Sequence, residues 1–470
     1  MYTDKKTYFN SIASKRIKQR RAKGYYWNDI TKYCNYFVHE NSSVLEIGCG
    51  TGELLNDLKA NKKVGIDFSE EMIDQAKTQF PNLDLRVMAA EVLILEEKFD
   101  VIILSNLIGY LDDIQKVLTQ LKSVSHENTK IIITYYSFVW EPILKFGEMI
   151  GYKTKTPNQN WLSLSEINNM LYLAGFHVYR NSRRMIFPLY IPLLSELFNG
   201  FLAKFPFFRL LSINNFTFAK NIQQENTQEK KYSVSVIIPA RNESGNIENA
   251  LLRMPNLGSS TELIFVESNS TDNTWNKIQE VKTKFDSKFN IETVQITESG
   301  KNAAVRKGFE IAKGEILMIL DADLTVAPED LVKFYNAIAR GKGDFINGSR
   351  LVYPMEKEAM RFLNRIGNKF FSSIFTWLLD QRFKDTLCGT KVMFKKDYEK
   401  LIINRKFFGE FDPFGDFDLL FGAHKLNLCI VELPVRYHER TYGRTNISRF
   451  KHGFILLRMC GFAARKIKFI

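Results

Sequence analysis

Cysteine is scarce in this chain of 470 residues and follows no recognisable pattern. The five cysteines are odd in number and share no paired spacing (Cys34, Cys49, Cys388, Cys429 and Cys460). We therefore expect neither a disulfide framework nor a cysteine-ligated zinc site. Free thiols are typical of proteins in a reducing compartment, so the composition indicates a cytoplasmic protein.

Long hydrophobic runs are lacking as well. A helix that crosses a membrane needs about 20 mostly apolar residues, and the N-terminal segment contains no apolar core typical of a signal peptide. The two most apolar stretches, residues 185–213 and 454–464, are both interrupted by charged residues. Each pattern is compatible with a buried helix or with a segment that lies in a membrane interface. Any membrane contact is expected to be peripheral, at the inner face of the plasma membrane.

Positive charge, in contrast, is abundant. The 65 lysines and arginines exceed the 52 aspartates and glutamates, which gives a formal net charge of +13. Such an excess favours a polyanionic partner, such as nucleic acid, an anionic membrane surface or a phosphorylated substrate. Hydrophobic residues make up 45% of the chain, which is typical of globular proteins, and the length accommodates two or three domains.

Strand and helix patterns alternate in two separate halves, on either side of a polar stretch. This alternation predicts an α/β fold in which right-handed crossovers build a mainly parallel sheet. We predict a first domain over residues 1–221 with a hydrophobic extension at 185–213, a linker over 222–231, and a second domain over 232–470. The predicted strands are 43–47, 63–66, 85–88, 101–104, 130–135, 234–238, 262–266, 291–296 and 316–320, and the predicted helices are 69–80, 113–124, 246–253, 274–284, 301–312 and 328–339.

Polar residues follow three of the predicted strands in the second half. They form the segments 239–243 (PARNE), 267–272 (ESNSTD) and 321–323 (DAD). Ligands bind beyond the carboxyl ends of strands in open parallel sheets, so we expect these segments to lie together. Asp321 and Asp323 share one face of an extended segment, and Mg²⁺ or Mn²⁺ takes such carboxylates as ligands, with substrate phosphates completing the shell. Taken alone, the triplet is equally compatible with a helix cap.

The motifs VSVIIPARNESGNI, FVESNSTDNTW and ILMILDADLTVAPED resemble glycosyltransferase family 2, whose members are inverting enzymes with the GT-A fold. The resemblance covers about residues 232–442 and implies a nucleotide-sugar donor. It implies that Asp321 faces the ribose and the metal, and that Asp323 faces the metal and the diphosphate. It also implies that the nucleoside pocket is lined by Pro239, Ala240, Asn242 and Glu243, with Glu267 near the base.

Transfer with inversion to a hydroxyl requires a general base on the acceptor side. The segment FGDFDLL resembles the acidic motif of the same family, and we predict Asp418 as the base, with Asp416 as its rival. The alternative is that one aspartate caps a helix and the other lies on a solvated face. The segments DTLCGTK and RYHERTYGR resemble those of polyprenyl-phosphate sugar transferases, which implies that Arg440 faces the donor diphosphate or a lipid phosphate.

A glycine-rich turn, EIGCGTG, follows the first predicted strand and opens a helix. Glycines allow the backbone to pass close to a ligand, and an acid about 20 residues further on, here Asp67, is suited to ribose hydroxyls. On these residues alone, a nicotinamide cofactor is an alternative ligand.

The motifs VLEIGCGTGELL, VGIDFSEEMI and FDVIILSNLIGYLDD resemble class I S-adenosylmethionine-dependent methyltransferases, which have a Rossmann-like fold. Methyl transfer by proximity and alignment needs no dedicated base, and a vestigial domain that only binds the cofactor is the alternative. The resemblance implies that the cofactor is held by Glu46, Gly48, Gly50, Gly52, Asp67, Glu91 and Ser105.

We therefore predict a bacterial-type enzyme that joins an inverting glycosyltransferase to a methyltransferase-like domain. Its expected acceptor is a cell-envelope glycan or a lipid-linked molecule. One alternative is a methyltransferase that acts on RNA, with a non-catalytic second domain; another is a catalytically inactive scaffold. Because no RNA-binding module is evident, a nucleic-acid partner is not expected.

Overall fold

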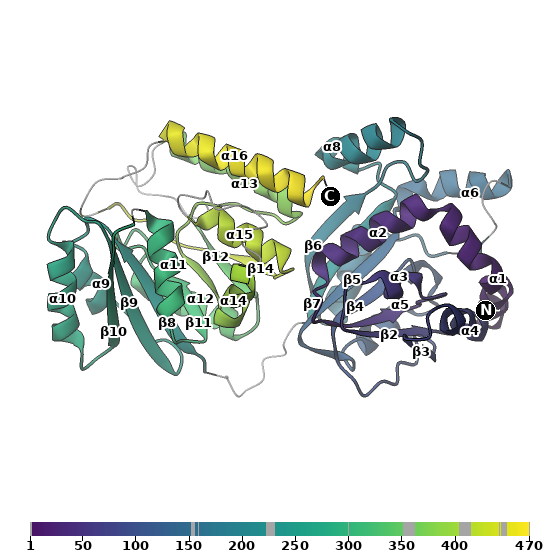
Figure 1. Cartoon of the computed structure of the whole chain (residues 1–470), viewed down its shortest axis with the longest axis horizontal. Coiled ribbons are helices and arrows are strands. Elements are labelled where there is room, and N and C mark those ends of the chain that lie inside the picture. Colours follow the sequence, from purple (N-terminus) through teal and green to yellow (C-terminus); the bar gives the residue numbers. More distant parts are fainter. Residues whose placement is uncertain are drawn as a thin grey trace. The chain divides into compact units, whose positions relative to one another are not determined.

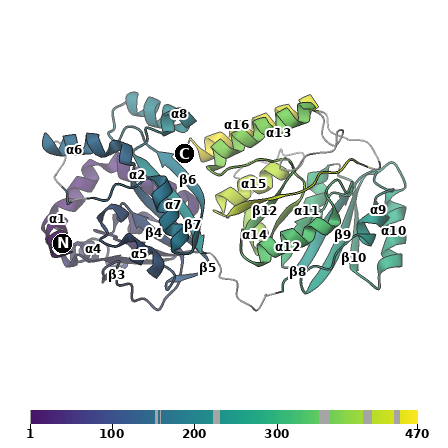
Figure 2. The same ribbon diagram turned by 180° about the vertical axis from the view of Figure 1, so that it is seen from behind.

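The computed structural model describes residues 2–151, 156–157, 159–221, 231–298, 300–350, 362–403, 415–440, 442 and 449–469. The chain divides into two compact units, Met1–Ile222 and Gln223–Lys468. Each unit contains one seven-stranded sheet with helices packed on its faces (Figures 1 and 2).

The first unit has the strand order β3-β2-β1-β4-β5-β7-β6. Strands β1 to β5 pair in parallel, whereas β7 runs antiparallel to both of its neighbours. The carboxyl ends of β1, β2 and β4 therefore meet at one edge of the sheet. The strands are β1 (Ser43–Ile47), β2 (Lys62–Asp67), β3 (Asp84–Val87), β4 (Phe99–Ser105), β5 (Ser125–Tyr136), β6 (Phe176–Arg184) and β7 (Asn214–Asn221).

Both faces of this sheet are apolar, because alternate residues of each strand point to opposite helix layers. Leu45 and Ile47 pack with residues of α5 and α7, whereas Gly65 approaches Leu55 of α3 on the other face. Helix α2 lies in front of the sheet in Figure 1 and α7 in front of it in Figure 2. The helices are α1 (Tyr2–Ala22), α2 (Gly24–Phe37), α3 (Glu53–Asp57), α4 (Glu70–Gln79), η1 (Ile108–Tyr110), α5 (Ile114–Gln120), η2 (Phe138–Trp140), α6 (Glu141–Met149), α7 (Leu164–Leu173), the π-helical η3 (Glu196–Phe201), η4 (Leu202–Lys204) and α8 (Pro206–Arg209).

The second unit has the strand order β10-β9-β8-β11-β13-β12-β14. Strands β8 to β11 are parallel, and β13 runs antiparallel between β11 and β12. The strands are β8 (Ser233–Ala240), β9 (Ser260–Ser268), β10 (Asn290–Ile296), β11 (Ile316–Ile319), β12 (Phe345–Ser349), β13 (Lys391–Phe394) and β14 (Ile430–Pro434).

Alternation also divides the second core into two layers. Val236 and Ile238 of β8 join a cluster with residues of α9, α10 and α12. Ile237 points the other way, where Gly308 of α11 leaves room: a Cβ there would lie 2.5 Å from Ile237 Cγ2. The helices are α9 (Ile247–Leu252), α10 (Thr274–Phe285), α11 (Lys301–Ile311), η5 (Pro328–Asp330), α12 (Leu331–Ala339), α13 (Phe362–Leu379), α14 (Lys395–Ile403), α15 (Asp416–Lys425) and α16 (Arg449–Ile467).

The predicted α/β class is confirmed, and the predicted strands and helices are present to within a few residues at their ends. The predicted helix 328–339 begins as the 3₁₀ turn η5. Sequence patterns do not predict the antiparallel strands β7 and β13. Strand β13 is only four residues long, and β7 directly follows the hydrophobic extension, whose apolar run obscures where the strand begins.

The hydrophobic extension at 185–213 is not a buried helix. It forms the short turns η3, η4 and α8, and much of its apolar surface is exposed. The interpretation of this stretch as a buried helix is therefore wrong. In the part of the chain that the structure describes, no helix is long and apolar enough to cross a membrane.

Candidate functional site

The carboxyl ends of β8, β9 and β11 meet at one edge of the second sheet (Figure 1). Asp321 and Asp323 lie just beyond β11, and Glu243 lies just beyond β8. The strand order therefore brings together carboxylates that are about 80 residues apart in the chain.

Asp321 forms an ion pair with Lys301, the first residue of α11, at 2.6 Å between Oδ1 and Nζ. Burial disfavours ionisation of Asp321, but Lys301 outweighs it and lowers the pKa of the carboxyl. Burial likewise opposes the charge on Lys301, yet Asp321 and Asp416 raise its pKa. The backbone at Gly389 passes so close that any Cβ there would collide with Asp321 and Lys301. A larger residue at this position would therefore displace the Asp321 carboxylate or the Lys301 ammonium group.

Arg440 bridges the other two carboxylates. Its Nη2 lies 2.5 Å from Asp323 Oδ2, and its Nη1 lies 3.1 Å from Glu243 Oε1. The second oxygen of Asp323 accepts hydrogen bonds from the Thr325 backbone N–H and hydroxyl at 3.2 and 2.9 Å. Burial raises the pKa of Glu243 to about 7; Arg440 opposes this shift, and Asp323 adds to it. Glu243 is therefore close to half ionised at neutral pH.

Asn242 adopts a left-handed conformation with φ 56°, which turns its side chain into the loop after β9. Its Oδ1 accepts from Thr271 N at 2.8 Å, and its own N–H donates to Ser270 Oγ at 3.0 Å. Glu267 is fully buried, and its two oxygens accept from Ser270 N at 2.5 Å and Gln295 Nε2 at 2.8 Å. The expectation that Glu267 contacts a base does not fit this position, because the side chain is buried and its carboxylate stabilises the loop after β9 by accepting from Ser270.

The last two residues of β8 differ in their exposure to solvent. Ala240 is 1% exposed and belongs to the hydrophobic core, so its side chain does not line a surface pocket as predicted. Pro239 is partly exposed and lies at the sheet edge. Strand alternation explains the difference, since neighbouring residues point to opposite faces.

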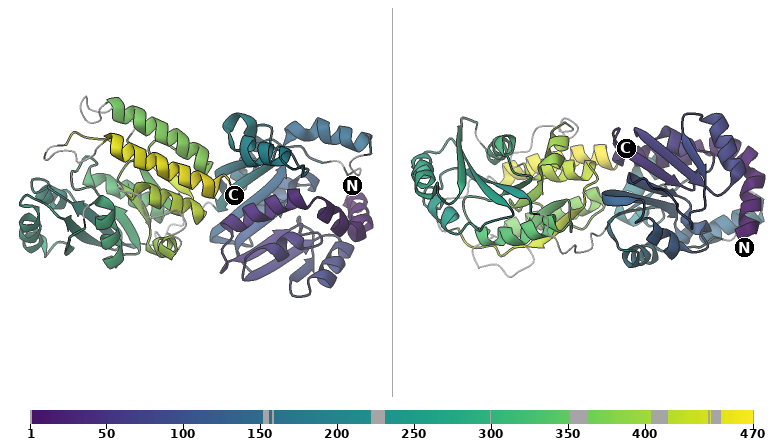
Figure 3. Two further views of the ribbon diagram at one scale, coloured as in Figure 1. Left: turned by 45° about the horizontal axis from the view of Figure 1, so that its top comes forward. Right: turned by 90° about the horizontal axis from the view of Figure 1, so that it is seen from below.

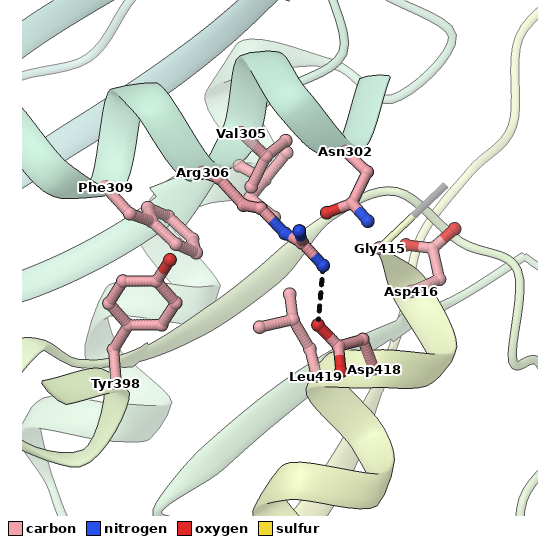
Figure 4. A pocket seen from close by; sticks show the side chains of 10 residues that line it. Asn302, Val305, Arg306, Phe309, Tyr398, Gly415, Asp416, Asp418 and Leu419 are labelled. Carbon is pink, nitrogen blue, oxygen red and sulfur yellow. Dashed lines mark hydrogen bonds and ion pairs between the residues drawn. The ribbon is translucent and has the colours of Figure 1, made fainter. Parts of the chain in front are cut away.

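Asp416 and Asp418 line a small cavity between α11 and the first turn of α15 (Figure 4). Gly415 caps α15 with φ 79°, and both aspartates are buried. Asp416 pairs with the buried Lys391 at 2.7 Å, and Asp418 pairs with Arg306 at 3.2 Å. The alternative of one helix cap and one solvated carboxylate is therefore wrong.

A second buried ion pair supports the segment that carries Gly389. Asp385 is fully buried and binds the Arg350 guanidinium at 2.7 and 2.9 Å; it also accepts from Asn368 Nδ2 at 2.7 Å. Burial raises the pKa of Asp385, but Arg350 more than compensates and lowers it to about 2. No local sequence pattern marks Arg350, because its partner Asp385 lies 35 residues away in the chain.

Four basic side chains pair with the acidic groups, and sequence reasoning predicts none of them: Lys301, Arg306, Arg350 and Lys391. For Lys301 and Arg306 the sequence signal is weak, namely their position on the amphipathic helix α11, which begins after Gly300. Among the predicted site residues, Arg440 joins Asp323 and Glu243 by ion pairs, and Asp321 lies near enough to raise the pKa of Glu243, whereas Asp418 belongs to the neighbouring cavity.

Asp321 and Asp323 fit part of the donor set of a divalent cation. Their side chains are 31% and 13% exposed, so an ion can reach them. Among the described residues, no group of three or more His, Cys, Asp or Glu side chains is arranged to hold a metal ion. Two carboxylates suit Mg²⁺ or Mn²⁺ only when substrate phosphates supply further oxygens.

The glycine-rich turn of the first unit contains three glycines with left-handed backbone conformations. Gly48, Gly50 and Gly52 all have positive φ, at 73°, 54° and 81°, which side chains other than glycine rarely adopt. Asp67, at the end of β2, accepts hydrogen bonds from the N–H groups of Gly50 and Ser69 at 2.9 and 3.0 Å. Asp67 therefore fixes the loop, and it also lines the adjacent pocket.

Glu46 lies below this turn and is only 2% exposed. Its Oε2 is buried and has no hydrogen-bond partner within the described residues. Burial raises the pKa of Glu46 to about 8; Arg20 of α1 opposes the shift, and Glu53 and Asp67 add to it. A buried acceptor without a partner costs free energy, so it marks a place where a ligand can donate.

A pocket opens beside the turn and is partly closed by α1. Lys5 of α1 donates to the carbonyl oxygen of Tyr110 at 2.8 Å and pairs with Asp112 at 2.6 Å. Ser105 instead bonds Thr134 at 3.3 Å and is not part of the lining. The contribution of α1 is not predicted from the sequence. The lining residues include the predicted Gly48, Asp67 and Glu91, together with Lys5, Phe68, Met88, Ala90, Leu107, Tyr110, Leu111 and Asp112.

Two family models match the chain, one for each unit. Residues 38–171 match a methyltransferase domain, and residues 235–403 match glycosyl transferase family 2. The first unit is also similar to a solved S-adenosylmethionine-dependent methyltransferase from Thermotoga maritima. That match has 16% identity and a TM-score of 0.36, and it covers 45% of this chain and 98% of the other.

The second unit is similar to two proteins named dolichol-phosphate mannosyltransferase. The one from Pyrococcus furiosus is 29% identical over 252 residues, which cover 50% of this chain and 67% of that relative. The one from Saccharomyces cerevisiae is 37% identical over 110 residues, which cover 22% of this chain and 40% of that relative. The chain thus spans about two thirds of the first relative and less than half of the second.

Proposed function

Since the chain joins a methyltransferase domain to a family 2 glycosyltransferase domain, we propose that the second unit transfers a sugar from a nucleoside diphosphate to a polyprenyl phosphate. The observation that carries this proposal is the group of Asp321, Asp323, Lys301 and Arg440 at the sheet edge. The name of the archaeal relative supports the choice of a lipid phosphate as acceptor.

We place the donor diphosphate between the Lys301–Asp321 and Arg440–Asp323 ion pairs. Lys301 and Arg440 are cations that already lie within 2.6 Å of the carboxylates, so both can turn to phosphate oxygens. A divalent cation held by Asp321 and Asp323 would supply charge neutralisation for the leaving diphosphate. Asn242 orders the loop after β9, which shapes the nucleoside side of the site.

The buried aspartates favour a phosphate over a hydroxyl as the acceptor group. A hydroxyl must lose its proton to a base during attack, but Asp416 and Asp418 are each bound to a cation. A phosphate monoester carries about −1.5 to −2 charges at pH 7 and attacks without a base. In that reaction a bond forms between the phosphate oxygen and the anomeric carbon. The carbon–oxygen bond to the diphosphate breaks, and the nucleoside diphosphate leaves.

The test measures transfer from UDP-, GDP- and dTDP-sugars to two matched acceptors, a polyprenyl phosphate and the corresponding polyprenol. We expect one donor to be consumed, with nucleoside diphosphate and a glycolipid formed from the phosphate acceptor only. Asp323→Asn should lower the yield of both products by about 10²–10³-fold, whereas Asp330→Asn, which alters a carboxylate paired on the surface with Lys333, should not. Transfer to the polyprenol alone, or turnover of no donor, would contradict the proposal.

For the first unit we propose a second activity, methyl transfer from S-adenosylmethionine. The unpartnered Oε2 of Glu46 and the glycine turn support this ligand, because its ammonium group can donate to a buried carboxylate. The bound cofactor supplies a methyl group on a sulfonium centre. We assign Asp67 to the ribose and Glu91 to the adenine side, because both line the pocket beside Gly48.

Calorimetric titration with S-adenosylmethionine tests this without any methyl acceptor. Because Glu46 is mostly protonated near pH 7 in the free protein, a bound ammonium group should drive its proton into the buffer. The binding enthalpy should therefore depend on the ionisation enthalpy of the buffer, and this dependence should vanish in Glu46→Gln. Glu71→Gln, an exposed change on α4, serves as the matched control. Absence of binding to the wild-type chain would exclude the activity.

A further inference from the structure

Helix α1 forms one wall of the pocket beside the glycine turn. It packs against α4, and in both views of Figure 3 it is the purple helix beside the N-terminal label. Lys5 lines the pocket, and Phe9 packs edge to face on the ring of Tyr110, which also lines it. One face of α1 therefore points toward the pocket, because residues three or four apart share a helix face. This face contains Lys5, Phe9, Ala13, Arg16 and Arg20.

Apolar burial contributes little to holding α1 in place. Among its described side chains, Ala13 is the only one that is buried. A helix on a protein surface normally packs through an apolar stripe, and most of the stability of such helices comes from packing of this stripe. The side of α1 that faces the pocket instead carries basic residues at both ends, and these favour a ligand with an anionic group.

Arg16 and Arg20 are one helical turn apart and lie near the same aromatic ring. Their guanidinium carbons are 5.9 and 4.2 Å from the centroid of Trp27, within cation–π distance. Burial raises the pKa of Asp67, and Arg16 is among the groups that oppose this shift. Arg20 Nη1 lies 3.7 Å from Glu53 Oε2. The two guanidinium groups therefore lie close to acidic residues near the carboxyl ends of β1 and β2.

Arg20 is largely buried but has no strongly bound partner. Its side chain is 13% exposed, and burial lowers its pKa, although Glu53 and Glu46 oppose the shift. The distance of 3.7 Å to Glu53 is too long for a hydrogen bond, and within the described residues Arg20 forms none. Glu53 does not depend on Arg20, because its carboxylate accepts from the Thr51 hydroxyl at 2.7 Å. A buried cation without a hydrogen-bonded counter-ion costs free energy, so Arg20 is suited to a carboxylate that a ligand brings.

Glu46 is the acidic counterpart of Arg20. Burial raises the pKa of Glu46, and Arg20 is the largest influence that opposes this shift, so the two charges act on each other. Among the described residues, however, no ion pair joins them, and Glu46 Oε2 has no hydrogen-bond partner. Each group is therefore close to an opposite charge that it does not contact. A ligand that carries an ammonium group and a carboxylate on one carbon can satisfy both.

We propose that Arg20 and Glu46 together bind an α-amino acid group, with the ligand carboxylate on Arg20 and its ammonium group on Glu46. The inference rests on the proposed methyl transfer from S-adenosylmethionine, which ends in such a group. The guanidinium offers two parallel N–H donors to a carboxylate. An inorganic anion is the less suitable ligand, because it would leave Glu46 Oε2 without a donor. The family match begins at residue 38 and does not assign Arg20.

Calorimetric titration of the full-length protein with two ligands tests this assignment. The ligands are S-adenosylmethionine and its decarboxylated form, which keeps the sulfonium and the ammonium group but lacks the carboxylate. Arg20→Gln removes the guanidinium. Lys18→Gln is the matched control, because it removes a positive charge from an exposed position of the same helix. Near-ultraviolet circular dichroism reports whether each variant is folded.

We expect the wild type to bind S-adenosylmethionine about 10- to 100-fold more tightly than the decarboxylated form, because hydrogen bonds between two charged groups are lost with the carboxylate. Arg20→Gln should weaken the binding of S-adenosylmethionine by a similar factor, and it should not weaken the decarboxylated form by more than about twofold. Lys18→Gln should leave both affinities within about twofold of the wild type. The comparison of the two ligands on the wild type decides the question even where a variant does not fold.

Three results would overturn the assignment while leaving S-adenosylmethionine as the cofactor. The first is a wild type that binds both ligands equally, and the second is an Arg20→Gln variant that binds S-adenosylmethionine as the wild type does. The third is equal weakening of both ligands in a folded Arg20→Gln variant, because Arg20 would then act on the position of α1 and not on the carboxylate. If the wild type binds neither ligand, the proposed methyl transfer itself is wrong, and the assignment fails with it.

Discussion

The two units place their acidic groups at the carboxyl ends of the strands of similar sheets, but the two sets of acidic groups differ in whether basic side chains contact them. In the second unit, Asp321, Asp323 and Asp385 each contact a lysine or an arginine within 2.7 Å. Among the described residues of the first unit, Glu46 has an oxygen without a partner, and Asp67 is bonded only to backbone N–H groups. Accordingly, the pKa values of Asp321 and Asp385 are lowered, whereas those of Glu46 and Asp67 are raised by burial.

This difference indicates the charge of the ligand that each site accepts. Where lysine and arginine side chains neutralise the carboxylates of a site, these cationic groups can move to the oxygens of an anionic diphosphate. A site with an unpartnered carboxylate gains most from a ligand that brings a positive group. Strand order places both sites, but the identity of neighbouring side chains determines their chemistry.

The largest expected effect concerns the buried pair in the second unit. Asp385→Asn leaves Arg350 buried without its counter-charge and should destabilise that unit by about 3–5 kcal/mol. Glu329→Gln, which alters an exposed pair with Arg253, should cost less than about 1 kcal/mol. Calorimetry that resolves the unfolding transitions of the two units measures both changes.

The pH dependence gives a sharper version of the same test. The pKa of Asp385 is lowered from 3.8 to about 2 in the folded protein. Its stabilising contribution is therefore complete above pH 4 and disappears as the pH falls through about 2. The difference between the wild type and Asp385→Asn should shrink over that window, and a difference of unchanged size at pH 2 would contradict the ion-pair explanation.

The second largest expected effect is that of removing the Asp323 carboxylate, which Arg440 contacts. Asp323→Asn should lower donor turnover by about 10²–10³-fold, because charge stabilisation at the leaving group is lost. Measurement at saturating donor separates this effect from weaker binding. If turnover falls by less than tenfold, the paired carboxylates do not act on the diphosphate, and the contrast between the two sites loses its functional meaning.

Glu46 tests the other side of the comparison. Its pKa is raised from 4.5 to about 8 in the folded protein, so the unfolded chain ionises first as the pH rises. The stability of the first unit should therefore fall between pH 4.5 and 8, by about 4 kcal/mol, and change little below pH 4.5. Glu46→Gln should flatten the profile. A wild-type profile that is already flat over this range would show that Glu46 is solvated or paired.

Glu243 is the one acidic group of the second site that resembles those of the first, since burial raises its pKa to about 7. Its ionised form competes with a donor diphosphate for Arg440, which lies 3.1 Å away. We expect the KM for the donor to rise about threefold between pH 6 and 8, because Glu243 ionises over this range. In Glu243→Gln the KM should be constant over this range, and an unchanged wild-type KM would exclude the competition.

Local sequence patterns predict where the two sites lie in the fold, but they do not predict which side chains form ion pairs within each site. The glycine turn and the acid triplet are short and contiguous, so the positions of Gly48, Gly50 and Asp321 follow from a few neighbouring residues. The pairing of Arg306 with Asp418 joins positions 112 residues apart, and no local pattern marks it. The expected base contact of Glu267 and the buried-helix interpretation of residues 185–213 fail for a related reason, because whether a side chain is buried depends on which elements cover it.

The smallest expected effect separates the two kinds of acceptor. Asp418 is the residue that sequence resemblance predicts as the base, yet it is buried and lies 3.2 Å from Arg306. Loss of a general base costs about 10²–10⁴-fold in rate, whereas a phosphate acceptor needs none. Asp418→Asn should therefore lower turnover with polyprenyl phosphate by less than about tenfold, with no change in the shape of the pH profile. A loss of 10²-fold or more, together with removal of an acidic limb from the profile, would instead identify Asp418 as a base. The second site would then leave one carboxylate available for proton transfer, and the contrast with Glu46 would hold only for the groups around the diphosphate.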